Sequence, residues 1–239
     1  MRTRAFTLVE LILVVAIMAT LAGTVVVMAE GTHDRVDRDL RMREMYAIRQ
    51  ALLQFQLDTG FFPGEGPFDH RNGHVPVGAF TEQWHDTAVN VWQLIRNPLE
   101  GGSHPLATWD PDRQRGWRGP YLTTSGEGQV FVPFIDGRSA PSSIDPGAGT
   151  PLSEPMPAIA DPALRPVAPP GSPFHWVTHY PPFQPLASQG RPYLIYLPRA
   201  ASGAVIRGPD SEAQVRCMGD DGLISTMAGT DDLTVYLFR

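Results

Sequence analysis

The sequence has one cysteine, no lysine and few charged residues. A single cysteine among 239 residues excludes an internal disulfide framework and a zinc site built from cysteines. Charged residues make up 18% of the chain, and the 25 acidic residues against 19 arginines give a net charge of −6, which argues against general binding to nucleic acid. The chain has 23 glycines and 24 prolines, so we expect many of its residues to form loops.

One long apolar run lies near the N-terminus. Residues 6–29 contain a single ionisable side chain, Glu10, and no proline. As a helix, this run would reach roughly 36 Å, enough to cross a hydrocarbon core of about 30 Å. Arg2 and Arg4 precede it, and short cationic flanks stay on the cytoplasmic side. The pattern therefore predicts a single membrane-spanning helix, with the bulk of the protein across the membrane.

A cleaved secretory signal is the alternative interpretation of this run, with Thr20-Leu21-Ala22 as the small-x-small cleavage site. Three features argue against it. The run is longer than the usual apolar region of a signal peptide, it has an acid near its start, and it leads directly into more helical sequence.

The residues at the start of the run carry a family resemblance. Arg4-Ala5-Phe6-Thr7-Leu8-Val9-Glu10 resembles the processing signal of type IV pilins and of the pseudopilins of type II secretion. The resemblance implies cleavage between Ala5 and Phe6 by a prepilin peptidase, N-methylation of Phe6 and a role for Glu10 in subunit assembly. Ala5 departs from the family, which usually has glycine there.

The helical pattern continues over 30–59 and changes character on the way. At 100° per residue, one face of its second half is apolar, which predicts packing on a globular domain; its residues are Met45, Ile48, Ala51, Leu52 and Phe55. Between residues 30 and 44 the same face carries Asp37, Arg41 and Glu44. We expect that charged stretch to be an exposed continuation of the membrane helix. Gly60 is expected to end the helix.

The remaining sequence predicts an α+β domain with an insertion. A short helix is expected over 87–96, and 116–122 (Gly-Trp-Arg-Gly-Pro-Tyr-Leu) resembles a stretch of the major pseudopilin that follows a short helix. Residues 139–185 hold 13 of the 24 prolines, which predicts an extended or flexible insertion without interior helix or central strand. Short antiparallel strands, covered by the apolar face of the long helix, are expected at 193–197, 204–207, 214–218 and 234–238.

Four aspartates lie close together near the C-terminus: Asp220, Asp221, Asp231 and Asp232. Acids converging in one loop would repel each other unless a cation such as Ca²⁺ bound them, although acidic turns are often simply solvated. The spacing is not that of an EF-hand. The segment is similar to the C-terminal calcium loop of major pseudopilins, which implies Asp221, Asp231 and Asp232 as the main side-chain ligands and a structural Ca²⁺ ion.

Sequence patterns for an enzyme are weak. Two His pairs, at 70 and 74 and at 175 and 179, have i, i+4 spacing, but glycine or prolines in and around them disfavour helical metal pairing. Cys217 lies in a predicted strand without a nucleophile motif, and we expect a buried, inert thiol. No catalytic residue is assigned, and the chain is expected not to be an enzyme.

The resemblance implies a structural subunit of a type II secretion pseudopilus. The subunit would be a single-pass protein of the bacterial inner membrane with its C-terminal domain in the periplasm. Its partners would be copies of itself, the prepilin peptidase, minor pseudopilins and the inner-membrane assembly platform. The expected parts are a leader (1–5), a transmembrane helix (6–29), its periplasmic continuation (30–59), a loop region with a short helix (60–138), the proline-rich insertion (139–185) and an antiparallel sheet with the acidic loop (186–239).

Two other interpretations remain open at the level of sequence. A type IV pilin or a minor pseudopilin would share the same N-terminal signal, and the long insertion favours a specialised position in a filament. A membrane-tethered periplasmic binding protein would instead use the insertion to capture a ligand and would form no polymer.

Overall fold

The structure is a computed structural model in which two compact units are distinguished, Met1–Leu40 and Arg41–Arg239. It describes residues 8–69, 91–124, 126–132, 150–151, 156–161, 175–176, 189–190, 192–200, 204–217, 219 and 233–239, apart from the side chains of 23–34, 126–132, 150–151, 156, 175–176 and 189–190.

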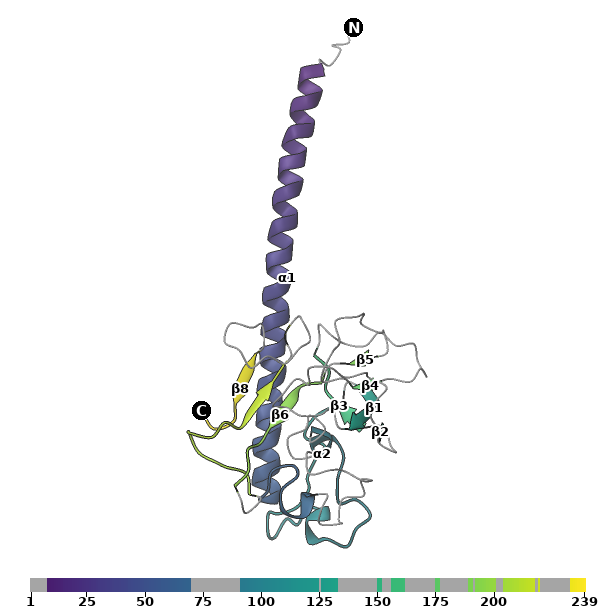
Figure 1. The fold of residues 1–239 in the computed structure, drawn as a ribbon, viewed down its shortest axis with the longest axis vertical. Coiled ribbons are helices and arrows are strands. Elements are labelled where there is room, and N and C mark those ends of the chain that lie inside the picture. The colour runs from purple at the N-terminus through teal and green to yellow at the C-terminus, as the bar shows by residue number, and fades with distance from the viewer. Residues whose placement is uncertain are drawn as a thin grey trace. The chain divides into compact units, whose positions relative to one another are not determined.

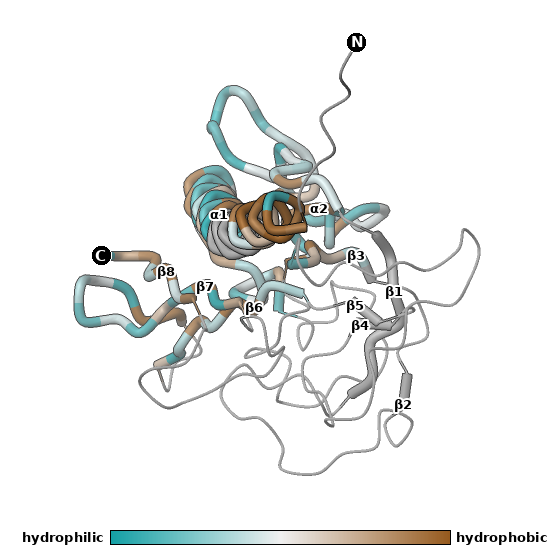
Figure 2. The backbone as a smooth tube through the Cα atoms, turned by 90° about the horizontal axis from the view of Figure 1, so that it is seen from above, coloured by the Kyte–Doolittle hydropathy of each residue, from teal (hydrophilic) through white to brown (hydrophobic). Residues whose placement is uncertain are grey.

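Helix α1 (Leu8–Thr59) is continuous over 52 residues. No proline interrupts it, and its N-terminal turns are hydrophobic in Figure 2. Among the side chains that the structure describes, no helical segment is both long and apolar enough to cross a membrane. The span expected over 6–29 includes residues 6 and 7 and the side chains of 23–29, which lie outside that description.

The C-terminal half of α1 belongs to the second unit and packs on its core through the face that the sequence predicts. Its five apolar residues are all buried in the core: Met45, Ile48, Ala51, Leu52 and Phe55. Each of the four larger side chains contributes about 1.5–3 kcal/mol by leaving water. Phe55 also packs edge-on against two aromatic rings, with centroid distances of 4.9 Å to Phe68 and 5.6 Å to Tyr121.

The helix ends as expected at Gly60, which adopts a φ of +88°. The Gly60 amide donates to the Gln56 carbonyl at 2.8 Å, and the Thr59 hydroxyl donates to the Phe55 carbonyl at 2.7 Å. Glycine is favoured here because a Cβ is strained at this φ. The guanidinium of Arg115 lies where such a Cβ would point, so the turn is also closely packed.

Strands β6 (Leu194–Tyr196), β7 (Gln214–Arg216) and β8 (Thr234–Tyr236) form an antiparallel sheet in that order. Figure 1 shows this sheet beside the C-terminal half of α1, and Leu194, Val215 and Val235 are buried in the same core as the helix face. Arg49 of α1 donates from Nε to the carbonyls of Tyr236 and Leu237 at 2.9 and 3.1 Å. The predicted α+β arrangement of a helix over a small antiparallel sheet is confirmed.

The prediction of a strand at 204–207 is wrong. This segment makes one isolated bridge, between Arg199 and Val205. The Val205 amide donates to the Glu65 carboxylate at 3.0 Å, so it does not take part in a strand ladder at that position.

A second sheet involves the proline-rich insertion. The sheet is ordered β2-β1-β4-β5, and β3 also pairs with β1. Its strands are β1 (Gly126–Val132), β2 (Thr150–Pro151), β3 (Met156–Ala158), β4 (His175–Trp176) and β5 (Gln189–Gly190). The expectation of no central strand within 139–185 is corrected, because β4 lies between β1 and β5. The insertion's strands are two or three residues long, in keeping with the lack of an amide donor at each proline.

The predicted short helix is present in the described residues as α2 (Trp92–Ile95), and residues 87–90 lie outside the description. Short 3₁₀ segments lie at Gly66–Phe68 and Pro105–Ala107. The stretch 116–122 packs on α2. The Tyr121 amide donates to the Leu94 carbonyl at 2.7 Å, and the rings of Trp117 and Tyr121 meet edge-on with centroids 5.8 Å apart.

Candidate functional site

The first turns of α1 expose large apolar side chains on all sides. Ten of these side chains are at least 48% exposed: Leu8, Val9, Leu11, Ile12, Leu13, Val14, Val15, Ile17, Met18 and Leu21. We call residues 8–21 the apolar segment. A helix that is hydrophobic all round is stable when something else covers it, either lipid or other helices. The apolar segment is therefore the strongest candidate for an assembly surface in the described part of the chain.

Glu10 lies in the first turn of α1, within the apolar segment, and is exposed. It is the one ionisable residue of the segment. The other polar residue is Thr20, whose hydroxyl donates to the Ile17 carbonyl of its own helix at 2.8 Å. The Thr20 hydroxyl proton is therefore used within its own helix.

The other predicted site residues lie outside the described residues. Ala5 and Phe6, which would flank the cleavage site, belong to this group, as do Asp220, Asp221, Asp231 and Asp232 of the acidic loop. Within the part of the chain that is described, no group of three or more His, Cys, Asp or Glu side chains is arranged to hold a metal ion. The processing and calcium sites thus stay predictions.

Within the second unit, two polar contacts join its part of α1 to the rest of that unit. Arg41 Nε lies 3.0 Å from Asp161 Oδ1, and both side chains are at least 96% buried. One turn further along, Glu44 Oε2 accepts a hydrogen bond of 2.8 Å from the Tyr193 hydroxyl. Burial, reinforced by this hydrogen bond, raises the pKa of Tyr193, so the phenol stays protonated and remains a donor.

These contacts correct the expectation that residues 30–44 form a wholly exposed stretch. Arg41 is buried and Glu44 is partly buried. A buried charge needs a partner, and the partner of Arg41 is 120 residues away in the sequence. Helical periodicity relates only residues within α1, so it could not predict that Asp161 pairs with Arg41.

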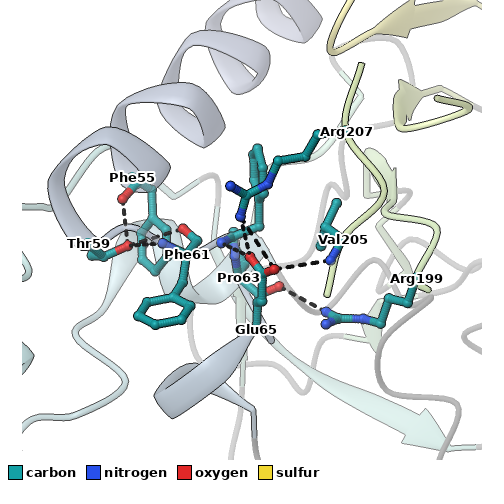
Figure 3. A network of polar contacts seen from close by, with 9 residues as sticks. Phe55, Thr59, Phe61, Pro63, Glu65, Arg199, Val205 and Arg207 are labelled. Atoms are coloured by element: carbon teal, nitrogen blue, oxygen red, sulfur yellow. Dashed lines mark hydrogen bonds and ion pairs between the residues drawn. The ribbon is translucent and has the colours of Figure 1, made fainter. Parts of the chain in front are cut away.

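Glu65 is the centre of a network that sequence reasoning missed (Figure 3). Its carboxylate, 8% exposed, accepts from the Phe62 amide at 2.8 Å, from the Val205 amide at 3.0 Å and from Arg207 Nη2 at 3.0 Å. Nearby, Arg199 Nη2 donates to the Pro63 carbonyl at 3.4 Å. The network joins the turn after α1 to the connection between β6 and β7. One signal was available, because Glu65 is the only acid in Phe-Phe-Pro-Gly-Glu-Gly-Pro-Phe.

Gln93 of α2, which follows this turn in the sequence, also forms hydrogen bonds to it. Its fully buried amide accepts from the Gly64 amide at 2.9 Å and donates to the Phe68 carbonyl at 2.9 Å. Both ends of the Gln93 amide are thus satisfied, as a buried amide requires. Glu65 and Gln93 together give the segment 61–69 its shape.

Cys217 follows β7 and is 2% exposed. Burial raises the pKa of its thiol, which keeps it in the unreactive protonated form. The predicted burial of this residue is confirmed.

The comparisons with known proteins give one partial relative. The type II secretion system core protein G of Klebsiella michiganensis is 37% identical over 60 residues, which are 25% of this chain and 42% of that protein. The match thus spans less than half the length of the relative. No family model matches the chain, and no solved structure matches it. This relative is a protein of the type II secretion system, which agrees with the resemblance found in the sequence.

Proposed function

We propose that this protein is a structural subunit of a type II secretion pseudopilus, a periplasmic filament that takes part in protein export. The observation that carries the proposal is the exposed apolar segment 8–21 with its single acid, Glu10. An apolar helix joined to a folded α+β unit suits a polymer in which helices pack together at the centre. The partial similarity to a type II secretion core protein supports the same assembly.

Before assembly, the subunit is held in the bacterial inner membrane by its N-terminal helix, with the second unit in the periplasm. The support is the sequence: the apolar run 6–29 and the two arginines that precede it. Partners follow from the assembly and are copies of this chain, the prepilin peptidase, minor pseudopilins and the assembly platform.

Processing at Phe6 tests the proposed function. The full chain, expressed with the prepilin peptidase, is expected to lose residues 1–5 and to begin with N-methylated phenylalanine; without the peptidase it stays intact. Terminal sequencing or mass spectrometry of the purified chain measures both. Because Ala5 replaces the usual glycine, Ala5→Gly serves as a control and is expected to be cut at least as fast.

An uncut chain in the presence of an active peptidase would contradict the pilin class and favour a tethered binding protein. A mature product trimmed near Ala22 and released into solution would instead show a cleaved secretory signal. Both outcomes are read from the same mass spectrum.

A second prediction concerns the acidic loop, for which we propose a structural Ca²⁺ site. Ca²⁺ is expected to raise the melting temperature of the protein, because a ligand that binds only the folded state at a hundredfold excess over its Kd adds about 2.7 kcal/mol. Asp231→Ala is expected to remove the shift. Asp112→Ala, which changes an exposed acid elsewhere, is expected to keep it.

Differential scanning fluorimetry with Ca²⁺, Mg²⁺ and chelator measures these shifts. If the unchanged protein has the same melting temperature with Ca²⁺ as with chelator, the calcium proposal is wrong. The filament proposal would be unaffected by that result.

A further inference from the structure

The glycines of β1 do little to specify the register in which β3 pairs with it. In the observed antiparallel register, Gly126 lies opposite Ala158 and Gly128 lies opposite Met156. Two residues further on, Ala160 follows the same alternation as Ala158. If β3 moved by two residues, an alanine would again face a glycine, and a glycine offers no side chain that could detect the change. Strands rich in glycine specify their register poorly for this reason.

The contacts of Ala158 and Ala160 also do little to specify the register. Ala158 and Ala160 are 5% and 0% exposed, so both sites in the core accept the same side chain. Ala160 pairs with Pro192 in an isolated bridge, and the Tyr193 amide donates to the Ile159 carbonyl at 3.0 Å. A slip of two residues would place Ala158 or Pro162 opposite Pro192, and would offer the Tyr193 amide the carbonyl of Pro157 or Asp161. The two alanine sites therefore do not determine the register of 156–161, whereas the core site of Ile159, 9% exposed, would receive Pro157 or Asp161 after a slip.

Asp161 breaks this repeat. Its carboxylate is paired with Arg41 at 3.0 Å inside the second unit. A movement of two residues would place Ile159 or Ala163 beside the buried guanidinium, and neither side chain has a charge or a hydrogen-bond acceptor. A buried charge without its partner is strongly unfavourable, whereas a complete buried ion pair often adds little net stability over apolar residues of similar size.

We propose that the Arg41–Asp161 ion pair is a register lock. Through Arg41 of α1, this pair fixes a single register of the segment 156–161 relative to β1 and to residues 192–193. The consequence reaches beyond this segment because the proline-rich sequence from Pro162 onward follows directly. A slipped register would give that sequence a starting point shifted by two residues. Arg41 and Asp161 act as positioning residues, and this inference does not depend on filament assembly.

Engineered disulfides can report the register in the full chain. Ala160→Cys with Pro192→Cys reports the observed alignment, because these residues are bridge partners. Ala158→Cys or Pro162→Cys, each with Pro192→Cys, reports a slip in one or the other direction. Every variant also carries Cys217→Ser, which removes the natural thiol. Cross-linking is read by peptide mass spectrometry after mild oxidation.

With Arg41 and Asp161 present, the 160–192 cross-link is expected to exceed either slipped cross-link at least about tenfold, since a slip leaves a buried charge unpaired. In the background of Arg41→Met with Asp161→Leu, a slipped cross-link is expected to rise to a yield similar to that of 160–192. The melting temperature of this apolar background is expected to be retained, which separates loss of register from loss of folding.

If the apolar background forms only the 160–192 cross-link, the register is determined elsewhere and the proposal is wrong. The background Arg41→Leu with Asp161→Val, which likewise removes both charges, decides the matter if the first apolar pair does not fold. In that background a slipped cross-link is again expected to rise, and an unchanged preference for 160–192 overturns the register lock.

Discussion

Filaments are expected to be absent when Glu10 is replaced by alanine, while the subunit still enters the membrane. A carboxylate inside hydrocarbon costs about 2.5–3.5 kcal/mol on insertion scales, so removing it does not oppose insertion. Cleavage before Phe6 would create an amine four residues from Glu10. An ion pair between that amine and Glu10 of a neighbouring subunit would align the two helices, and Glu10→Ala would remove this alignment.

The measurement separates assembly from insertion. Filaments are sheared from cells and imaged by electron microscopy, and insertion is followed by resistance to alkaline extraction. Thr20→Ala is the matched control in the same apolar segment, because the Thr20 hydroxyl already donates to its own helix. It is expected to assemble normally. Glu10→Gln distinguishes charge from hydrogen bonding and is expected to fail as Glu10→Ala does.

Normal filaments from Glu10→Ala would contradict the role assigned to Glu10. Loss of membrane insertion in this variant would contradict it in another way, because the defect would then precede assembly. The tethered-binding-protein interpretation makes the opposite prediction, since a protein that does not polymerise has no need of the carboxylate.

Glu65→Ala is expected to lower the free energy of unfolding by about 3–5 kcal/mol, because it leaves two buried amide groups without an acceptor. These are the amides of Phe62 and Val205, which donate hydrogen bonds of 2.8 and 3.0 Å to the Glu65 carboxylate. The Arg207 contact adds less, because the Arg207 side chain is 44% exposed and water screens the pair. The loss should therefore come mainly from the two amides.

Denaturation of the full chain in detergent, followed by tryptophan fluorescence, measures this loss. Arg207→Ala removes only the half-exposed partner and is expected to cost about 1 kcal/mol or less. Glu100→Ala changes an exposed acid and is expected to stay within about 0.5 kcal/mol of the unchanged chain. Equal losses from Glu65→Ala and Arg207→Ala would mean that the ion pair, and not the amide contacts, carries the network.

Local patterns predicted the parts of this fold that depend on neighbours along the chain. The apolar face with Met45, Ile48 and Phe55 follows directly from 3.6-residue periodicity. Gly60 ends α1 because a residue at positive φ is needed there. The strand at 214–216 and the strand at 234–236 were also found from alternation and turns.

Patterns were less successful for the insertion and for polar residues. High proline content suggested that 139–185 has no central strand, yet His175–Trp176 lies between two other strands. Composition describes the average tendency of a segment, whereas a two-residue strand needs only two suitable positions. Likewise, Val205 looked like part of a strand, but its amide is bound by a carboxylate 140 residues away.

The sequence by itself determined a long α1, its packed face and the exposed apolar segment around Glu10, since backbone hydrogen bonds and side-chain period in a helix are local properties. Only the tertiary structure decided which charges are buried. Arg41 and Glu65 resemble ordinary surface residues in the sequence, and each becomes acceptable in the interior through a partner more than 100 residues away. Burial of a charge depends on that partner's position, which no local pattern contains.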